Sequence, residues 1–321
     1  MPTGHLPWQT FVKILQRENM KYSKQHHVDQ DPDHINVHWD SLTICQLNCS
    51  YCYARNEYGE NWGKISPKST IDAVIESLNR SSLSFNLGLL GGEPTINPHY
   101  YYILDKLSTL EKFKWVYIVT NGEKDLTSHP HYEKLSFLFS YHPADCTNRD
   151  RFIDNIKLML SRGYKCKVNI MLHHDKNLWP RIKEMFEICA DIPGLKVHPH
   201  FLYGNSIQKL FHYRPAFWDY FRFLEDFDKE LVYDDEVFND FQIFDRKLTN
   251  FKGWSCWNNN YEIDHEGRVI QFCKVDANDK VDLNRDLDFF KRIEKTVPIT
   301  CPHRACNCDG LLKQLKVKNA S

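Results

Sequence analysis

Three cysteines within eight residues constrain this chain more than any other feature. Cys45, Cys49 and Cys52 are separated by three and then two residues. Thiolates are soft ligands that suit iron–sulfur clusters and zinc, and a cubane cluster normally takes four of them. A group of three would therefore leave one iron of a cubane open to another ligand. The alternative is a structural zinc site that borrows a fourth ligand, such as His38, although zinc sites favour two matched cysteine pairs.

A glycine-rich turn follows the apolar run at residues 85–90. The turn consists of Gly91, Gly92, Glu93 and Pro94. The apolar run predicts a buried strand, and the two glycines would let the backbone at its carboxyl end approach a ligand closely. Taken alone, such a turn is a weak signal for function.

Together, the cysteine loop and the glycine-rich turn resemble the radical SAM superfamily. The resemblance extends to the aromatic Tyr51 before the third cysteine and to Thr120, Asn121 and Gly122 at the end of a later strand. It implies a [4Fe–4S] cluster held by the three cysteines, whose open iron binds the amino and carboxylate groups of S-adenosylmethionine. The resemblance is specific for the chemistry and says little about the substrate.

Composition and hydropathy disfavour several classes of function. Lysine and arginine number 41 against 42 acidic residues, and a net charge of −1 gives no electrostatic footprint for nucleic acid or an anionic membrane. No apolar run reaches the roughly 18 residues of a membrane span, and residues 1–16 lack the apolar core of a signal peptide. We therefore expect a cytoplasmic α/β protein in a reducing compartment.

Strand and helix patterns alternate from residue 34 onward. We expect strands at 34–39, 85–90, 115–119, 135–141, 166–172 and 195–203, and helices at 69–78 (capped by Ser69 or Thr70), 101–110, 151–162 and 178–189. Such alternation predicts βαβ units and a parallel sheet. A closed eight-stranded barrel is the usual outcome, but only about six strands can be counted, and the resemblance implies an open, partial (β/α)6 barrel. Ligands in either architecture bind at the carboxyl ends of the strands.

The chain divides into four parts on its sequence patterns. They are an N-terminal extension (1–33), the partial barrel (34–213), a helical bridge (214–250) and a small cysteine-rich region that contains a hairpin (251–321). Aromatic residues recur at helical spacing in the bridge, which favours core packing over a binding surface. The extension is short for an independent peptide-binding module.

A second group of cysteines falls in the last fifth of the chain. Its members are Cys256, Cys273, Cys301, Cys306 and Cys308. Two strand-like runs around a turn at Glu266 and Gly267 predict a β-hairpin, which would bring the first two cysteines of the group close together. Four thiolates would satisfy either a zinc ribbon or a cubane cluster.

The hairpin and cysteine-rich tail resemble the auxiliary-cluster region of radical SAM enzymes, the SPASM domain or its shorter twitch form. Five cysteines cannot fully ligate two cubanes, so we expect one auxiliary [4Fe–4S] cluster, with zinc as the alternative. The spacing departs from the usual SPASM pattern, which leaves open which four of the five bind. The isolated Cys166 and Cys189 are expected to be core thiols, and Cys146 is expected to be buried or idle, with lining of the active site as the alternative.

The resemblance also assigns cofactor contacts. The Gly91–Glu93 turn would meet the methionine amino group, and Ser140, at the end of the fourth strand, matches a position that often contacts the ribose. The other candidates for cofactor binding are Tyr51, Pro94, Asn121, His173 and Tyr203. His198 and His200 either line the substrate or adenine side with Tyr203 or form one face of a buried strand.

The resemblance implies that S-adenosylmethionine is cleaved reductively to a 5′-deoxyadenosyl radical, which abstracts hydrogen from a substrate C–H bond. We expect a peptide to be crosslinked, oxidised or epimerised, because peptide-modifying enzymes dominate the SPASM and twitch group. A small molecule such as a sugar or aminoglycoside is the alternative, and a non-catalytic metal-binding scaffold is the alternative from another class. An electron donor such as flavodoxin or ferredoxin is implied as a partner.

Overall fold

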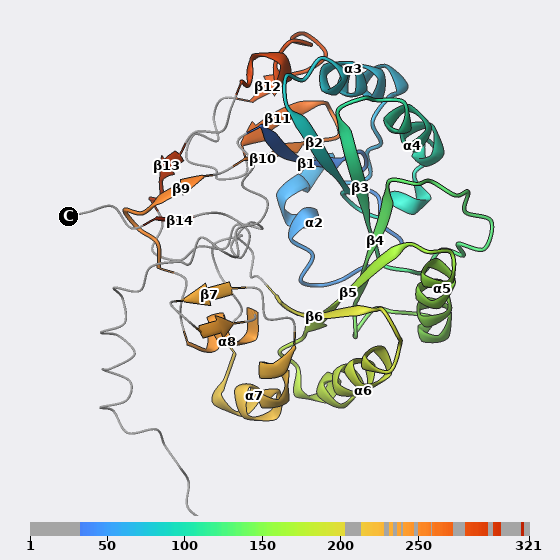
Figure 1. Cartoon of the computed structure of the whole chain (residues 1–321). Helices are drawn as coiled ribbons and strands as arrows, with labels where there is room; N and C mark the ends of the chain where they lie inside the picture. The colour runs from blue at the N-terminus through green and yellow to red at the C-terminus, as the bar shows by residue number, and fades with distance from the viewer. Residues whose placement is uncertain are drawn as a thin grey trace, which may run out of the picture.

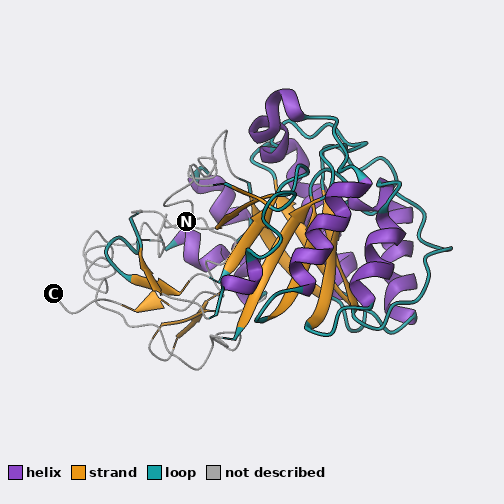
Figure 2. Cartoon of the chain, turned by 90° about the horizontal axis from the view of Figure 1, so that it is seen from above, coloured by secondary structure: helices purple, strands orange, loops and turns teal. Residues whose placement is uncertain are grey.

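An open, mostly parallel sheet organises the protein. The computed structural model describes residues 33–202, 213–227, 231–233, 236–238, 240–246, 250–257, 259–271, 280–294, 298–302 and 316–317. Nine strands form the main sheet, in the order β12-β11-β10-β1-β2-β3-β4-β5-β6. The sheet curves, with helices α3 to α6 along its outer side and α2 on its concave side (Figure 1). Figure 2 shows helices (purple) packed against one side of the strands (orange).

The six strands of the barrel are neighbours in chain order and pair in parallel. They are β1 (His34–Asp40), β2 (Ser84–Leu90), β3 (Phe113–Thr120), β4 (Leu135–Tyr141), β5 (Lys165–Leu172) and β6 (Lys196–Phe201). The helices are α2 (Tyr53–Tyr58), α3 (Lys68–Asn79), α4 (Tyr100–Ser108), α5 (Arg149–Ser161) and α6 (Trp179–Ala190), with 3-10 turns η3 (Gly59–Asn61), η4 (Pro94–Ile96) and η5 (Lys176–Leu178). The predicted partial (β/α)6 barrel is confirmed.

Alternation along β1 shows why the strands form where the sequence predicts them. Ile35, Val37 and Trp39 are fully buried in the main core together with side chains of α3 and α4. Successive side chains of a strand point to opposite faces, so Asn36 and His38 face the concave side. The outer face of each strand is thus apolar under the helices, and the concave face is free to carry polar groups.

The start of α3 differs from the prediction. The helix begins at Lys68 with Pro67 at the cap position, and neither Ser69 nor Thr70 caps it. Thr70 instead lies inside the first turn, where its Oγ1 donates to Asn284 Oδ1 at 3.1 Å. Proline suits this position because its fixed φ tolerates the helix entry and it needs no N–H partner.

The predicted C-terminal hairpin extends the barrel sheet. β10 (Asn260–Ile263) pairs with β11 (Arg268–Gln271) in antiparallel fashion and with β1 in parallel, and β12 (Val281–Asp282) follows β11. Gly267 occupies the turn at φ +78°. The hairpin, assigned to the C-terminal region from sequence, is therefore structurally continuous with the barrel.

Cys256 lies in a different sheet from that hairpin. It belongs to β9 (Ser255–Trp257), which pairs with β13 (Pro298–Thr300) and β14 (Lys316–Val317). We predicted that the hairpin brings Cys256 close to Cys273. Cys273 lies outside the described part of the chain, so this stays a prediction. Cys306, Cys308, Tyr203 and nearly all of the N-terminal extension also lie outside it.

The predicted helical bridge is only partly helical. Its described residues form α7 (Pro215–Tyr220), η6 (Arg222–Asp226), α8 (Asp240–Asp245) and a two-stranded sheet of β7 (Leu231–Tyr233) and β8 (Glu236–Phe238). β-Branched and aromatic residues at 231–233 and 236–238 favour strands over helix. The aromatic residues pack as predicted, since Phe241 of α8 contacts Phe201 of β6 with ring centroids 6.2 Å apart.

No helix among the described residues is long and apolar enough to cross a lipid bilayer.

A buried histidine between β3 and β4 should make stability depend on pH. His129 is 5% exposed, its Nδ1 lies 2.6 Å from the Pro130 carbonyl and its Nε2 lies 2.9 Å from Tyr100 Oη. Burial lowers its pKa, and the positive charges of Arg162 and Lys124 add to the effect, although the hydrogen bond to Pro130 opposes it. The unfolded chain therefore binds a proton at a pH where the folded protein does not.

We expect the melting temperature to fall as pH drops below about 6.5 through the folded pKa of His129. His129→Gln cannot take up that proton, so the difference in melting temperature between pH 7.5 and pH 5.5 should shrink by about 2 °C or more. Circular dichroism melts at both pH values measure it. The exposed His131→Gln is the matched control, and a His129→Gln profile parallel to wild type would contradict the assignment.

Candidate functional site

The cysteine loop follows β1 and leads into α2 at the carboxyl ends of the barrel strands. Cys49 is 8% exposed, while Cys45 and Cys52 are half-buried. The Cys52 N–H donates to the Cys49 carbonyl at 3.1 Å, which folds the end of the loop into a turn. Burial raises the pKa of the Cys45 thiol to about 11. Burial also raises the pKa of the Cys49 thiol, and the nearby carboxylate of Asp145 raises it further.

N–H groups point at the cysteine sulfurs from several directions. The donors are Leu47 N–H (3.4 Å) and Asn121 Nδ2 (3.5 Å) to Cys45 Sγ, and Arg55 N–H (3.5 Å) to Cys52 Sγ. N–H donors favour the thiolate that binds metal. No three His, Cys, Asp or Glu side chains in the described residues are grouped as ligands of a single ion. A cubane would give each cysteine its own iron, so holding one would not require the three sulfurs to converge on a single ion.

The glycine-rich turn after β2 lies directly against this loop. The Gly92 N–H donates to the Leu42 carbonyl at 3.0 Å, and the Glu93 N–H donates to the Ile44 carbonyl at 2.8 Å. A Cβ on Gly91 would lie 2.1 Å from Leu42 O, and one on Gly92 would lie 1.9 Å from Ile44 O. We predicted that these glycines let the backbone approach a ligand closely, and that role stays a prediction. The space where their side chains would stand is filled by the backbone of Leu42 and Ile44.

Glu93 joins the turn to the end of β3. Its carboxylate is 1% exposed and accepts four hydrogen bonds, two from Thr95 (3.1 and 2.6 Å), one from Thr120 Oγ1 (2.8 Å) and one from Asn121 N–H (2.7 Å). Burial raises its pKa, and these hydrogen bonds oppose the shift. Three of these bonds are to Oε1 and one is to Oε2, so the carboxylate is used largely within the protein.

Tyr51 lies between two histidines that the sequence places far away. Its Oη is 2.9 Å from His142 Nδ1, and the two rings stack with centroids 5.9 Å apart and 17° between their planes. His173 meets Tyr51 edge-on, with centroids 5.5 Å apart. His142 Nδ1 is also 3.5 Å from Cys49 Sγ. Burial lowers the pKa of His142 to about 4, with a further contribution from His200.

A polar row crosses the concave face of β4, β5 and β6. Ser140 lies opposite Asn169, and Asn169 lies opposite His198, all of them buried. From sequence, His198 and His200 could either line the substrate or adenine side or form one face of a buried strand. Both alternate along β6 with Val197 and Phe201, which belong to the apolar core, so both histidines lie on the concave face of the sheet. Asn169 Oδ1 is buried without a hydrogen-bond partner.

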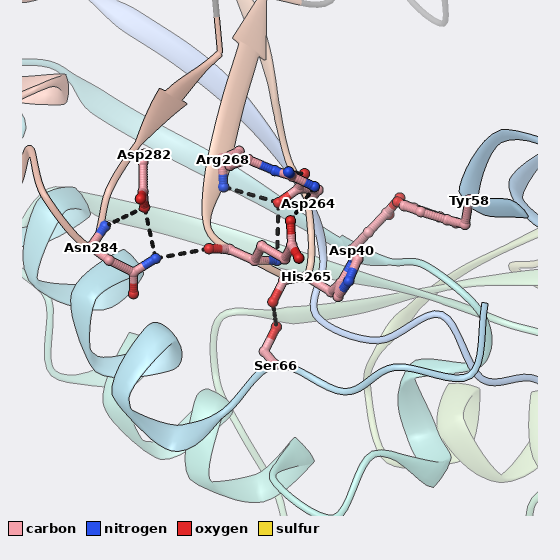
Figure 3. Close-up of polar contacts among 9 residues, drawn as sticks. Asp40, Tyr58, Ser66, Asp264, His265, Arg268, Asp282 and Asn284 are labelled. Carbon is pink, nitrogen blue, oxygen red and sulfur yellow. Dashed lines mark hydrogen bonds and ion pairs between the residues drawn. The ribbon is translucent and has the colours of Figure 1, made fainter. Parts of the chain in front are cut away.

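The turn of the C-terminal hairpin packs beside α2. Ser66 Oγ donates to the His265 carbonyl at 2.8 Å (Figure 3). Asn284 Nδ2 donates to the carbonyl of Glu266, the next residue in the turn, at 2.8 Å. Tyr58 of α2 donates to the Asp40 carboxylate, and its ring meets that of His265 edge-on at 5.7 Å. The hairpin thus supports the helix that follows the third cysteine.

The structure therefore brings most predicted residues together. Around the cysteine loop lie Cys45, Cys49, Cys52, Tyr51, Gly91, Gly92, Glu93, Pro94, Asn121 and His173. Ser140 lies near the end of β4 in the polar row. Their roles toward a cofactor stay predictions. Sequence reasoning missed His142, although its position directly after the fourth predicted strand was a signal that could have found it.

Two of the five C-terminal cysteines are described, Cys256 within β9 and Cys301 directly after β13, the strand that pairs with β9. Cys256 and Cys301 are both buried, and the Cys301 N–H donates to the Trp254 carbonyl at 2.8 Å, next to the β9–β13 pairing. The isolated Cys166 and Cys189 are buried as predicted, and burial raises the pKa of each to about 12.

Residues 40–143, which contain both motifs, match the family model of the Radical SAM superfamily. Over these residues the chain is similar to radical SAM proteins. The family implies a [4Fe–4S] cluster and S-adenosylmethionine. The chain is 24% identical over 174 residues to 7-carboxy-7-deazaguanine synthase of Methanothermobacter thermautotrophicus, covering 46% of this chain and 67% of that protein.

Solved radical SAM enzymes share the fold of the chain. The structure of Streptococcus suis SuiB bound to its precursor peptide SuiA has a TM-score of 0.53 at 15% identity, over 89% of this chain and 69% of that one. The structure of anSMEcpe with bound AdoMet and the Cp18Cys peptide also has a TM-score of 0.53, at 13% identity and over 81% of both chains. At 13–15% sequence identity, these two structures show a shared fold only.

Proposed function

We propose that the protein is a radical SAM enzyme that abstracts hydrogen from a peptide substrate. The observation that carries the proposal is the docking of the three-cysteine loop onto the glycine-rich turn through Gly92 and Glu93, within the matched domain. Cys45, Cys49 and Cys52 would hold the cluster. When bound, the cluster supplies one electron that cleaves S-adenosylmethionine to methionine and a 5′-deoxyadenosyl radical.

The residues around the loop would orient the reactants and exclude water. Cys49 and Tyr51 share a small apolar cluster with Leu47, Met171 and Leu202. Burial on this side keeps bulk water from the sulfur of Cys49, which suits the handling of a reactive radical. Asn121 connects the loop to β3, because its amide bonds both Cys45 Sγ (3.5 Å) and Gln46 Nε2 (3.1 Å).

The concave face offers polar groups to a substrate. His38 Nε2 and Tyr117 Oη are 2.5 Å apart, across the strand that separates them. Gly88 lies below the tyrosine ring, where a Cβ would be 2.4 Å from Tyr117 Cζ. Both polar side chains are half-buried. This pair of polar side chains on the concave face would suit a substrate group that forms hydrogen bonds. His38 pairs with Tyr117 here and is not grouped with the cysteines as a zinc ligand.

The peptide proposal is supported by SuiB and anSMEcpe, which share the fold and have structures with bound peptides. The sequence relative 7-carboxy-7-deazaguanine synthase favours the alternative, a small-molecule substrate.

We further propose one auxiliary [4Fe–4S] cluster held by four of the five C-terminal cysteines. It is supported by the pairing of β9, which contains Cys256, with β13, which directly precedes Cys301. A flavodoxin or ferredoxin would be the electron donor.

The test is cleavage of S-adenosylmethionine by the anaerobically reconstituted protein with dithionite. We expect 5′-deoxyadenosine and methionine in mass spectrometry, with none formed by the iron-free protein. Stimulation by peptides supports the peptide proposal, and stimulation only by purines, sugars or aminoglycosides supports the alternative. A protein that assembles its cluster and cleaves no S-adenosylmethionine would be a scaffold, and the proposal would be wrong.

A further inference from the structure

His142 is joined to the cysteine loop by two contacts and belongs to neither motif. It directly follows β4, and its Nδ1 lies 3.5 Å from Cys49 Sγ and 2.9 Å from Tyr51 Oη. The stacked ring of Tyr51, at 17° to its own, fixes the plane of the imidazole. The position of Nδ1 is therefore set by β4 on one side and by the cysteine loop on the other.

The three cysteine sulfurs show a common pattern. In the part of the chain that the structure describes, Cys45 Sγ accepts N–H groups from Leu47 and Asn121, and Cys52 Sγ accepts the N–H of Arg55. The corresponding nitrogen at Cys49 Sγ is His142 Nδ1. A thiolate bound to iron has no hydrogen and can only accept a hydrogen bond. A cluster bound at Cys49 therefore favours the His142 tautomer that carries its hydrogen on Nδ1.

We propose that His142 is a positioning residue for the cluster, whose Nδ1–H donates to the Cys49 sulfur and raises the reduction potential of a cluster bound there. The inference rests on the proposed function, because it needs a cluster on Cys49. A hydrogen bond to sulfur stabilises the extra negative charge of the reduced cluster and so favours reduction. Tyr51 holds the imidazole plane and competes for the same nitrogen.

The experiment is an anaerobic redox titration of the reconstituted protein, followed by EPR without S-adenosylmethionine. The signal read is the one that disappears when Cys45, Cys49 and Cys52 are replaced together by alanine. His142→Phe keeps an aromatic ring against Tyr51 and lacks the donor. We expect its ratio of reduced to oxidised cluster at a fixed potential to fall about tenfold, which corresponds to a midpoint about 59 mV lower for one electron.

Two further variants separate donation from packing. His142→Asn places an amide nitrogen near the former Nδ1 and should restore most of the potential, whereas a purely structural role would not be rescued by so small a side chain. His173 also meets Tyr51 edge-on, but among the described residues no hydrogen bond joins it to a cysteine sulfur. In the absence of S-adenosylmethionine, His173→Phe should therefore keep the wild-type potential.

The outcomes distinguish this inference from the proposed function. A cluster in the wild type with the same potential in His142→Phe would overturn the inference alone. If His142→Phe assembles no cluster, the comparison of His142→Asn with His142→Leu decides, and equal potentials in those two would also overturn it. Absence of any cluster from the wild-type protein would overturn the proposed function and the inference together.

Discussion

Replacement of Cys45, Cys49 and Cys52 by alanine is expected to abolish S-adenosylmethionine cleavage and to remove about four irons per chain. The three thiols are the cysteines of one loop, and alanine cannot ligate iron. The glycine-rich turn contacts the loop through the Leu42 and Ile44 carbonyls, so the substitutions leave that docking intact. We therefore expect a folded protein without the cluster and a loss of at least about 100-fold in 5′-deoxyadenosine formation, since the proposed reaction takes its electron from that cluster.

The same variant counts the metal centres. About eight irons in the wild type and about four in the variant would establish an auxiliary cubane that does not depend on the cysteine loop. About four irons in the wild type, none in the variant and zinc in both would make the C-terminal site structural. Cys189→Ala is the matched control, because this thiol is fully buried against Met185, and it should retain the wild-type iron content. Wild-type cleavage by the triple variant would refute the assignment of the loop.

Gly92→Ala should have the second largest effect. A Cβ there would lie 1.9 Å from the oxygen, 2.3 Å from the carbon and 2.8 Å from the nitrogen of Ile44, all backbone atoms. No rotamer change can relieve a clash with backbone, so the turn and the cysteine loop must move apart. The bonds from Gly92 to Leu42 and from Glu93 to Ile44 would then be lost. We expect a loss of about 3 kcal/mol in unfolding free energy, together with most of the bound iron.

Gly194→Ala is the control for backbone strain without a clash. Gly194 has φ +79°, which disfavours alanine, but nothing lies within 4 Å of the added Cβ. It should lose about 1 kcal/mol and keep its iron. Thermal melts and iron analysis of both variants provide the comparison. Gly92→Ala with wild-type iron content would show that the loop does not need this close approach.

The pattern of β1 shows how far sequence reasoning reached for the fold. Ile35, Val37 and Trp39 alternate with polar residues, and this local period predicts a strand with one face in the core. The same reasoning found β2 to β6 and the helices between them to within one or two residues. It could not find that β10 joins the edge of β1, because strand pairing between Asn36 and Asn260 depends on contacts between residues far apart in the chain.

The site divides in a similar way. Ligand chemistry depends on residue type and spacing, so the sequence by itself identified the cysteine triad and the neighbouring turn, and it predicted a metal centre there. Only the tertiary structure decided that the backbone of the cysteine loop occupies the space beside Gly91 and Gly92. It also decided that the Glu93 carboxylate forms hydrogen bonds within the protein and that His142 lies 3.5 Å from Cys49 Sγ. These are contacts between separate strand ends, and a local pattern carries no information about which side chains the folded sheet brings within hydrogen-bonding distance.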